Sequence, residues 1–442
     1  MGEFAAMAER ERSDGVTAAV QHALGWLVAG NAIGVMLAIL LLLPQLNAWL
    51  GEWTYGRWMM VHMNTLLYGW CSVPMLAMLV KAYGADRGSL AAWARPAVWL
   101  WSAALLAGSW SWLQGHSSGK LFLDWSGYAR VLFPLALLGL WTLMALGFVK
   151  NREAERNGGA ARAARVAGLL VLLPVPFALY VVSSPSIYPA VNPATGGPTG
   201  SSQLESTLGV VLILLALPFG LAPRKQGLRR IAAIAWSAFS IEVALTAVLG
   251  RADVSHHAPA QYLSLASVLV WIALIPAYYA QFEWNPATRR WRTCFLAWWG
   301  GLVLSGWVVF LPGVLDRLKF TDALVGHSLV AVAGFLSAYV VFILVQVLGE
   351  RDAWILNRTW SFYAWNGGVL AYVIVIMIAG WMEGTDPAFT IAPGAARDTI
   401  YVVRLLTGIS MLAGSVEWFI ASLSLKTAAA RVHVAVPGVE VA

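Results

Sequence analysis

Two histidines within apolar stretches are the residues of this sequence whose chemistry first needs an explanation. The segment "RWMMVHMNTLLYGW" contains His62, and the segment "DALVGHSLVAVAGFL" contains His327. An ionisable side chain inside a membrane segment is costly, so such residues are candidates for a functional site. Neutral imidazole in an apolar setting is a good ligand for iron.

The composition predicts an all-α, polytopic membrane protein. Of the 442 residues, 59% are hydrophobic and only 12% are charged, and soluble proteins carry about 25% charged residues. Apolar runs of roughly 20 residues, each long enough to cross a bilayer, recur along the whole sequence. We expect twelve spans, near residues 20–43, 58–80, 96–115, 131–149, 164–183, 207–222, 231–250, 262–281, 294–312, 323–348, 362–382 and 399–425.

The distribution of basic residues predicts the orientation of these spans. Twelve spans put both termini on one side, and only eight of the 29 Lys and Arg residues lie on the other: Arg57, Lys120, Arg130, Arg251, Arg317, Lys319, Arg397 and Arg404. By the positive-inside rule both termini are cytoplasmic, as in a multi-pass protein of a bacterial-type inner membrane. This asymmetry explains the net charge of +7 without nucleic acid as a partner. We expect a cytoplasmic N-terminal tail (residues 1–18), a transmembrane domain (19–426) and a cytoplasmic C-terminal tail (427–442).

The two membrane histidines are expected at similar depths near the outer face. His62 follows Arg57 by five residues and His327 follows Lys319 by eight, which places the rings about 7 and 12 Å beyond those charges. Two such rings on distant helices favour one shared cofactor layer, with haem as the cofactor. The chain lacks Cys-x-x-Cys-His, so such a haem would be non-covalent. The alternative is that each ring simply reaches the headgroups or caps a neighbouring carbonyl.

Three segments resemble the catalytic subunit, subunit I, of haem–copper oxidases. "TYGRWMMVHMNTLLYGW" is similar to the second span of that family, "LKFTDALVGHSLVAVAGFLSA" to the tenth and "YVVRLLTGISMLAG" to the twelfth. The resemblance is closest to the C-type cytochrome c oxidases, which are similar to nitric oxide reductases. It implies a membrane oxidoreductase of the respiratory electron-transport type. The haem would be b-type, and a cytochrome c or another donor subunit would bind on the outer face.

The haem ligands that this resemblance implies are incomplete. His62 matches a low-spin haem ligand, and the tenth span of the family carries Gly-His-x-His. The first histidine of that motif holds the high-spin haem, and the second completes the low-spin site. The matching positions are His327 and Leu329. Leucine cannot coordinate iron, so the usual bis-histidine site has lost one ligand.

The copper ligands that the resemblance implies are also altered. Glu205 stands in the stretch that corresponds to the first copper histidine, and the adjacent pair of the seventh span falls near Arg251 and Ala252. A His-His pair follows at His256 and His257. A shift of the loop could bring this pair to copper, whereas the simpler interpretation is a solvated pair. Two imidazoles without a third nitrogen would make a weak copper site.

Other polar residues of the spans have both functional and structural interpretations. Glu242 could relay protons as a catalytic carboxylate, and Glu417 could do the same, although each could also be a hydrogen-bonded residue that fixes helix packing. Arg397 and Arg404 could bind haem propionates, because guanidinium–carboxylate pairs suit that task. The alternative for both arginines is an ordinary position at the membrane interface. Lys120 and Asp124 are expected to form an ion pair in an outer loop.

Three classes of function are therefore compared. The first is a haem-binding redox subunit that transfers electrons or reduces a small gas such as oxygen or nitric oxide. Within it, His62 and His327 could hold separate haems, or they could ligate one haem from opposite faces. The second class is a non-catalytic scaffold subunit that anchors partners in a membrane complex. The third is a twelve-helix secondary transporter, for which "GADRG" at residues 84–88 offers a shortened form of a known loop motif.

Overall fold

The computed structural model describes residues 14–120, 123–151, 159–191, 204–225, 229–249 and 257–425. The secondary structure of these residues is helical, apart from an isolated β-bridge between Arg224 and Phe282. The first half of the chain contains α2 (Asp14–Leu42), η1 (Pro44–Leu50), α3 (Tyr55–Asn64), η2 (Thr65–Trp70), α4 (Val73–Ala82), η3 (Gly88–Leu90), α5 (Ala91–Leu113), α6 (Ala129–Lys150), α7 (Gly159–Leu172), α8 (Val175–Val182), α9 (Leu204–Ala216) and α10 (Pro218–Leu221).

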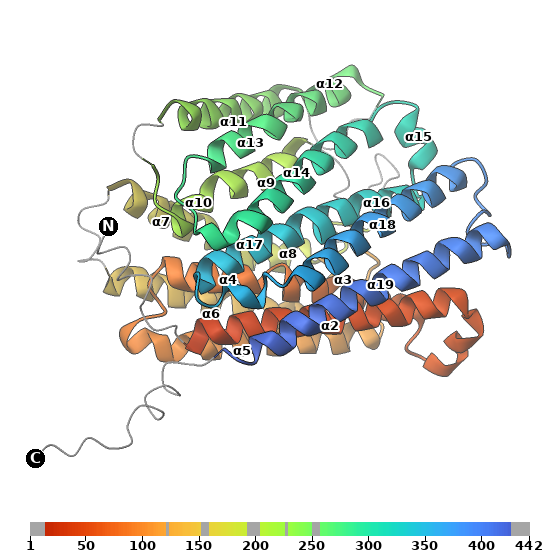
Figure 1. The fold of residues 1–442 in the computed structure, drawn as a ribbon, viewed down its shortest axis with the longest axis horizontal. Coiled ribbons are helices and arrows are strands. Elements are labelled where there is room, and N and C mark those ends of the chain that lie inside the picture. The colour runs from red at the N-terminus through yellow and green to blue at the C-terminus, as the bar shows by residue number, and fades with distance from the viewer. Residues whose placement is uncertain are drawn as a thin grey trace, which may run out of the picture.

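The second half of the chain continues the same pattern. It contains α11 (Arg229–Leu249), α12 (Pro259–Ser267), η4 (Val268–Val270), α13 (Trp271–Tyr279), η5 (Pro286–Thr288), α14 (Arg289–Val309), α15 (Val314–Leu318), α16 (Asp322–Leu329), η6 (Val330–Leu336), α17 (Ser337–Leu348), η7 (Ala353–Ile355), α18 (Thr359–Glu383) and α19 (Ala395–Ser422). The long helices run alongside one another in a single bundle (Figure 1).

The expected all-α membrane fold is confirmed, and helices occupy all twelve expected positions. Among the described residues, ten helices or helix runs are long and apolar enough to cross a membrane. The helix Thr207–Leu221 is apolar but shorter, and α14 is outside the group of ten. The first turn of α14 carries Arg289, Arg290 and Arg292, which lower its mean hydropathy. The count of twelve spans is therefore not confirmed.

The first and last helices meet at one end of the bundle. The start of α2 and the end of α19 lie side by side (Figure 1), and the Gln21 side-chain amide donates a hydrogen bond to the Ser422 carbonyl at 3.2 Å. Within the described residues, α2 already includes Asp14, six residues before the expected start of this span. Glycine at position 15 allows α2 to lie against Ala94 of α5. The remaining residues of the expected N-terminal tail and all of the C-terminal tail lie outside the described residues.

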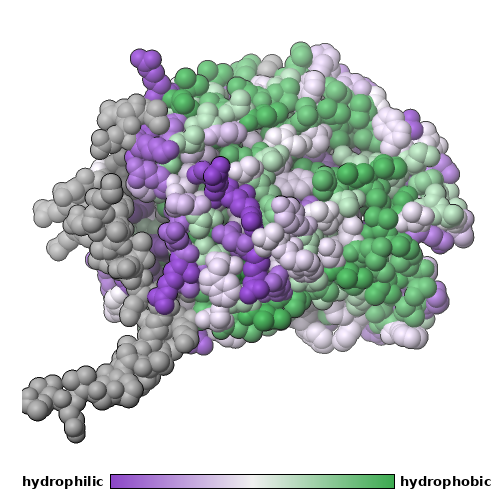
Figure 2. Space-filling model, viewed as in Figure 1, coloured by the Kyte–Doolittle hydropathy of each residue, from purple (hydrophilic) through white to green (hydrophobic). Residues whose placement is uncertain are grey.

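Apolar side chains cover much of the surface, as a lipid environment requires. Hydrophobic residues dominate the visible face, and strongly hydrophilic residues gather mainly toward the end of the bundle at which α2 begins (Figure 2). The interior is rich in aromatic residues. Its almost completely buried tryptophans are Trp70, Trp112, Trp125, Trp271, Trp291, Trp299 and Trp418.

In the described part of the chain, two helix runs contain π-helical segments, and these are the runs with the membrane histidines. The π-helix η2 begins three residues after His62, and the π-helix η6 begins three residues after His327. Segments of this kind widen a helix locally and often occur at functional sites. The indole of Trp70, at the end of η2, donates a hydrogen bond at 2.9 Å to the Ser337 hydroxyl, which directly follows η6. This contact joins the two segments.

The contact between α16 and α18 makes a test of the packing possible. A Cβ atom on Gly380 would lie 1.9 Å from the Ala323 nitrogen, so Gly380→Ala would force the two backbones apart. We expect this substitution to lower the free energy of unfolding by about 1–3 kcal/mol, measured as the melting of the purified protein in detergent. Gly367→Ala on the same helix is the matched control, because nothing lies within 4 Å of its Cβ position. Equal stability of the two variants would contradict the observed helix contact.

Candidate functional site

His62 lies on α3, and its ring packs against α2. Its Nδ1 atom is 2.8 Å from the Gly30 carbonyl oxygen. Since a carbonyl can only accept a hydrogen bond, Nδ1 carries the proton, and Nε2 of the neutral ring keeps a free lone pair. A Cβ atom on Gly34 would lie 2.7 Å from the Cε1 atom of the ring. Glycine at position 34 therefore makes room for the imidazole.

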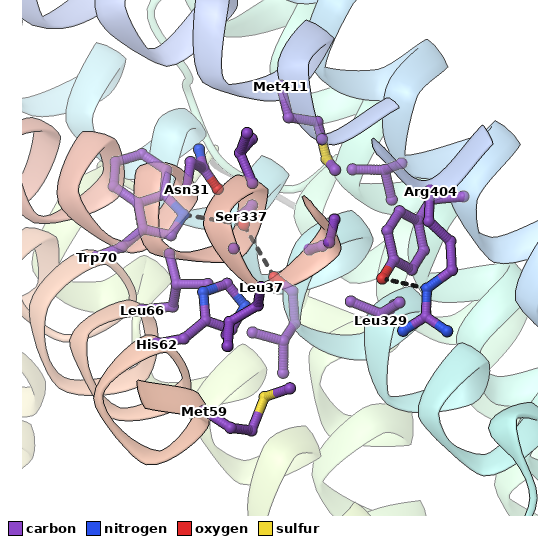
Figure 3. Close-up of a pocket in the computed structure, with 18 of the residues that line it drawn as sticks. Asn31, Leu37, Met59, His62, Leu66, Trp70, Leu329, Ser337, Arg404 and Met411 are labelled. Atoms are coloured by element: carbon purple, nitrogen blue, oxygen red, sulfur yellow. Dashed lines mark hydrogen bonds between the residues drawn. The ribbon is translucent and has the colours of Figure 1, made fainter. Parts of the chain in front are cut away.

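The ring borders a cavity that we call the His62 cavity. Its walls come from α2 (Asn31 and Gly34 among others), α3, η2, the α16–η6 run, α18 and α19. Figure 3 shows His62 on one side of this space and Leu329 on another. The cavity brings together segments that lie more than 300 residues apart in the sequence, such as α2 and α19. Apolar side chains form most of its lining.

Hydrogen-bonded pairs of polar side chains connect the walls of the cavity. Trp70 and Ser337 line it and are bonded to each other, and the Ser337 hydroxyl also donates to the Val332 carbonyl at 2.9 Å. The Asn31 amide donates to the Ser415 hydroxyl at 3.2 Å. These hydrogen bonds satisfy polar atoms where water is excluded. They also fix the positions of η2 and α2, which lie next to His62, relative to η6 and α19.

A charged group lies at one edge of the cavity. Arg404 donates from Nη1 to the Asp322 carboxylate at 3.0 Å and from Nε to the Tyr372 hydroxyl at 3.1 Å. Arg404 and Tyr372 both line the cavity. Arg397 lies elsewhere: its guanidinium pairs with Asp398 at 2.7 Å, and it is not among the described residues that line this cavity. Of the two arginines that the sequence suggests as haem-propionate ligands, only Arg404 lines the His62 cavity.

His327 faces a different side of its helix from Leu329. Its Nδ1 atom is 3.2 Å from the Ser305 hydroxyl of α14, and a Cβ atom on Gly306 would lie 3.2 Å from its Cε1. Phe310 approaches the ring edge-on at a centroid distance of 6.4 Å. Leu329, two residues later, lines the His62 cavity, and His327 is not among its described lining residues. This arrangement disfavours ligation of one group by both histidines.

The two membrane glutamates are both hydrogen-bonded. Glu242 is buried, and its carboxylate accepts a hydrogen bond from the Trp271 indole at 2.7 Å. Glu417 pairs with Arg358 at 2.8 Å and also accepts from the Ser361 hydroxyl. Neither residue is among the described residues that line the His62 cavity. These contacts favour helix packing for Glu417, while the buried carboxylate of Glu242 remains a candidate for proton transfer.

The expected copper residues are only partly described. His257 is exposed, and its Nε2 lies 3.0 Å from the Asp316 carboxylate. His256, Arg251 and Ala252 lie outside the described residues. Glu205 belongs to the first turn of α9, and its side chain is also outside the description. Within the described part of the chain, no group of three or more His, Cys, Asp or Glu residues could hold a metal ion.

The expected ion pair between Lys120 and Asp124 is wrong. The Lys120 ammonium donates to the carbonyls of Ser183 and Val182, at 2.6 and 3.2 Å, just after α8. Asp124 instead accepts from the backbone and hydroxyl groups of its own loop, including Ser118 and Gly119. Free carbonyls at the end of a helix attract a cation. The short sequence separation of Lys120 and Asp124 does not reveal that such carbonyls lie nearby. Burial lowers the pKa of Lys120, and the nearby carboxylate opposes this shift.

Two methionines line the His62 cavity that the sequence did not indicate as site residues. Met59 and Met411 both line the cavity, and Figure 3 shows their side chains at its border. A methionine within an apolar helix is more often a core residue than a ligand, so the sequence gives no signal by itself. The spacing of three residues places Met59 on the same helix face as His62, and no comparable spacing points to Met411.

Comparisons with known proteins give a match in structure alone. No family model matches the sequence, and no curated protein matches it. The fold is similar to a chain of a haem–copper terminal oxidase dimer solved by cryo-electron microscopy, with a TM-score of 0.49 and 12% sequence identity. The similarity covers 97% of this chain and 85% of the other.

The contact between Glu242 and Trp271 predicts different effects for two substitutions. Glu242→Gln keeps an acceptor oxygen for the indole, whereas Glu242→Leu leaves a buried N–H without a partner. We expect the leucine variant to lose about 1–3 kcal/mol of stability and the glutamine variant to stay close to the parent protein. Thermal unfolding in detergent measures both. Equal losses would instead mean that the charge or the proton of the carboxyl group matters.

Proposed function

We propose that the chain is a membrane haem-binding redox subunit of the haem–copper oxidase type. The observation that carries the proposal is His62: its ring lies in an apolar cavity between transmembrane helices, with Nδ1 bound to a carbonyl and the lone pair of Nε2 free. An axial haem ligand needs this tautomer and this outer partner. The motifs around His62 and His327 add to this support.

The residues of the cavity suit a porphyrin in two respects. The lining is mostly apolar, and Gly34 leaves space against the imidazole. Arg404 supplies a guanidinium at one edge, although Asp322 already balances its charge. This guanidinium could bind a carboxylate of the cofactor.

His327 supports a second haem in a separate place. Its ring turns toward Ser305 and Gly306 of α14, away from the cavity that Leu329 lines. A haem held there by one histidine would keep a free coordination position, which suits the binding of a small gas. Bound haem would supply one-electron chemistry at both places. The residues of the chain would hold it, exclude water and, at Glu242, offer a carboxyl group for protons.

The electron donor is proposed to come from another chain. We expect a cytochrome c or a similar donor subunit at the outer face, on the side that the scarcity of Lys and Arg assigns to the outside of a bacterial-type inner membrane. The scaffold and transporter classes predict a protein without haem. The absorption spectrum of the purified protein therefore separates the proposal from both alternatives.

The proposal predicts which haem the protein carries. We expect the purified protein to carry non-covalent, b-type haem that acid acetone extracts. His62→Ala and His327→Ala should each remove a different haem signal, because the two rings lie in separate places. His116→Ala is the control, since this residue is exposed in an outer loop. A protein without a Soret band, or unchanged spectra in both membrane variants, would refute the proposal.

A substitution on the neighbouring helix tests the same site without removing a ligand. Gly34→Ala places a Cβ atom 2.7 Å from the His62 ring and should weaken or shift the same haem signal as His62→Ala. Gly25→Ala, also on α2, is the matched control, because its Cβ would make only an ordinary 3.5 Å contact with Phe419. Equal haem content in the two variants would contradict the assigned position.

The proposal also predicts the copper content. His257 already pairs with Asp316, and arginine and alanine at positions 251 and 252 offer no ligand at neutral pH. We therefore expect substoichiometric copper and little four-electron reduction of oxygen by the purified chain. Metal analysis should give the same copper content for the parent protein and for a variant with both His256 and His257 replaced by alanine. One tightly held copper per chain, lost in this variant, would restore a conventional oxidase.

A further inference from the structure

The side of the His62 cavity at Leu329 offers no ligand to an iron bound by His62. The inference that follows rests on the proposed function, because it concerns the second axial position of the same haem. Most polar groups of the cavity are unsuitable. Indole and guanidinium groups have no lone pair to donate, and the Ser337 and Tyr372 hydroxyls are engaged with Trp70 and Arg404. Thioethers are established axial ligands of haem.

Among the described residues that line the cavity, thioethers occur at Met59 and Met411. Met59 precedes His62 by three residues on α3, and residues with this spacing lie on the same face of a helix. A side chain from that face cannot reach the opposite side of a haem that His62 holds. Met411 comes from α19, a different wall of the cavity, and its side chain borders the space that His62 and Leu329 also border (Figure 3).

The contact between α18 and α19 positions Met411. A Cβ atom on Gly368 would lie 2.9 Å from the Met411 Cγ atom and 3.2 Å from the Thr407 carbonyl oxygen. Glycine at position 368 therefore makes room for the methionine stem between the two helices. The neighbouring Ser410 hydroxyl donates to the Ala364 carbonyl at 3.0 Å and holds the helices together at this level. The flexible thioether can adjust beyond this fixed stem.

We propose that Met411 is the second axial ligand of the haem that His62 binds, in place of a ligand at position 329. The His62 haem is then low-spin and transfers electrons without an open position for a gas. Gas binding is left to the haem at His327. A thioether opposite an imidazole also raises the reduction potential relative to a pair of imidazoles.

The experiment uses the full-length protein in detergent, in a His327→Ala background that leaves only the His62 haem. The near-infrared magnetic circular dichroism of the ferric haem identifies its axial ligands. We expect a histidine–methionine signal and no binding of carbon monoxide to the ferrous haem. Met411→Leu, which keeps the size and the apolar character of the side chain, should abolish this signal, allow carbon monoxide to bind and lower the midpoint potential. Met59→Leu should change neither the signal nor the gas binding.

A variant that adds a ligand tests the inference even if Met411→Leu fails to fold. Leu329→His offers a second imidazole, and we expect it to convert the histidine–methionine signal into a bis-histidine signal. Carbon monoxide binding by the parent His62 haem, a bis-histidine signal before any substitution, or loss of the thioether signal in Met59→Leu rather than Met411→Leu would each overturn the inference and leave the proposed function intact. A chain that binds no haem at all would overturn both.

Discussion

The hydrogen bond between His62 and the Gly30 carbonyl is the interaction on which the proposed site depends. A histidine inside a membrane must satisfy both ring nitrogens or leave one for a ligand. The carbonyl accepts a hydrogen bond from the Nδ1–H group at 2.8 Å, so only Nε2 stays available. This geometry requires a close approach of α2 and α3. Gly30 and Gly34 provide it, since a Cβ atom on Gly30 would lie 2.6 Å from Leu66 and one on Gly34 would meet the His62 ring.

The opposite walls of the cavity are held by contacts that bridge distant parts of the sequence. Trp70 and Ser337 connect the π-helical segments η2 and η6, and Asn31 and Ser415 connect α2 and α19. In a membrane, where lipid tails compete equally for apolar side chains, hydrogen bonds between helices and close contacts of small residues determine which helices associate. The same contacts therefore stabilise the bundle and position the cavity.

The sequence predicted the large-scale architecture because apolar length and charge asymmetry are strong signals. Hydropathy and spacing could not predict the features that depend on packing in three dimensions. The close approach of α2 to α5 depends on Gly15 meeting Ala94, and the position of Lys120 depends on carbonyls that a helix end leaves free. Met411 is indistinguishable from a core residue until α19 is placed beside α2 and α3. His327 lies apart from the His62 cavity because residues 327 and 329 face different sides of the helix. The expectation that the two rings lie at similar depths does not determine which side of the helix each ring faces.

That periodicity also determines how the two proposed haem positions relate to each other. Residues 327 and 329 project to different sides of α16, since successive residues of an α-helix turn by about 100°. His327 faces Ser305 of α14, whereas Leu329 lines the His62 cavity. A change of ligand at position 329 therefore leaves the surroundings of His327 unaltered. The His62 cavity can lose one imidazole and take another ligand from α19 while the position on the other side of α16 keeps its own histidine.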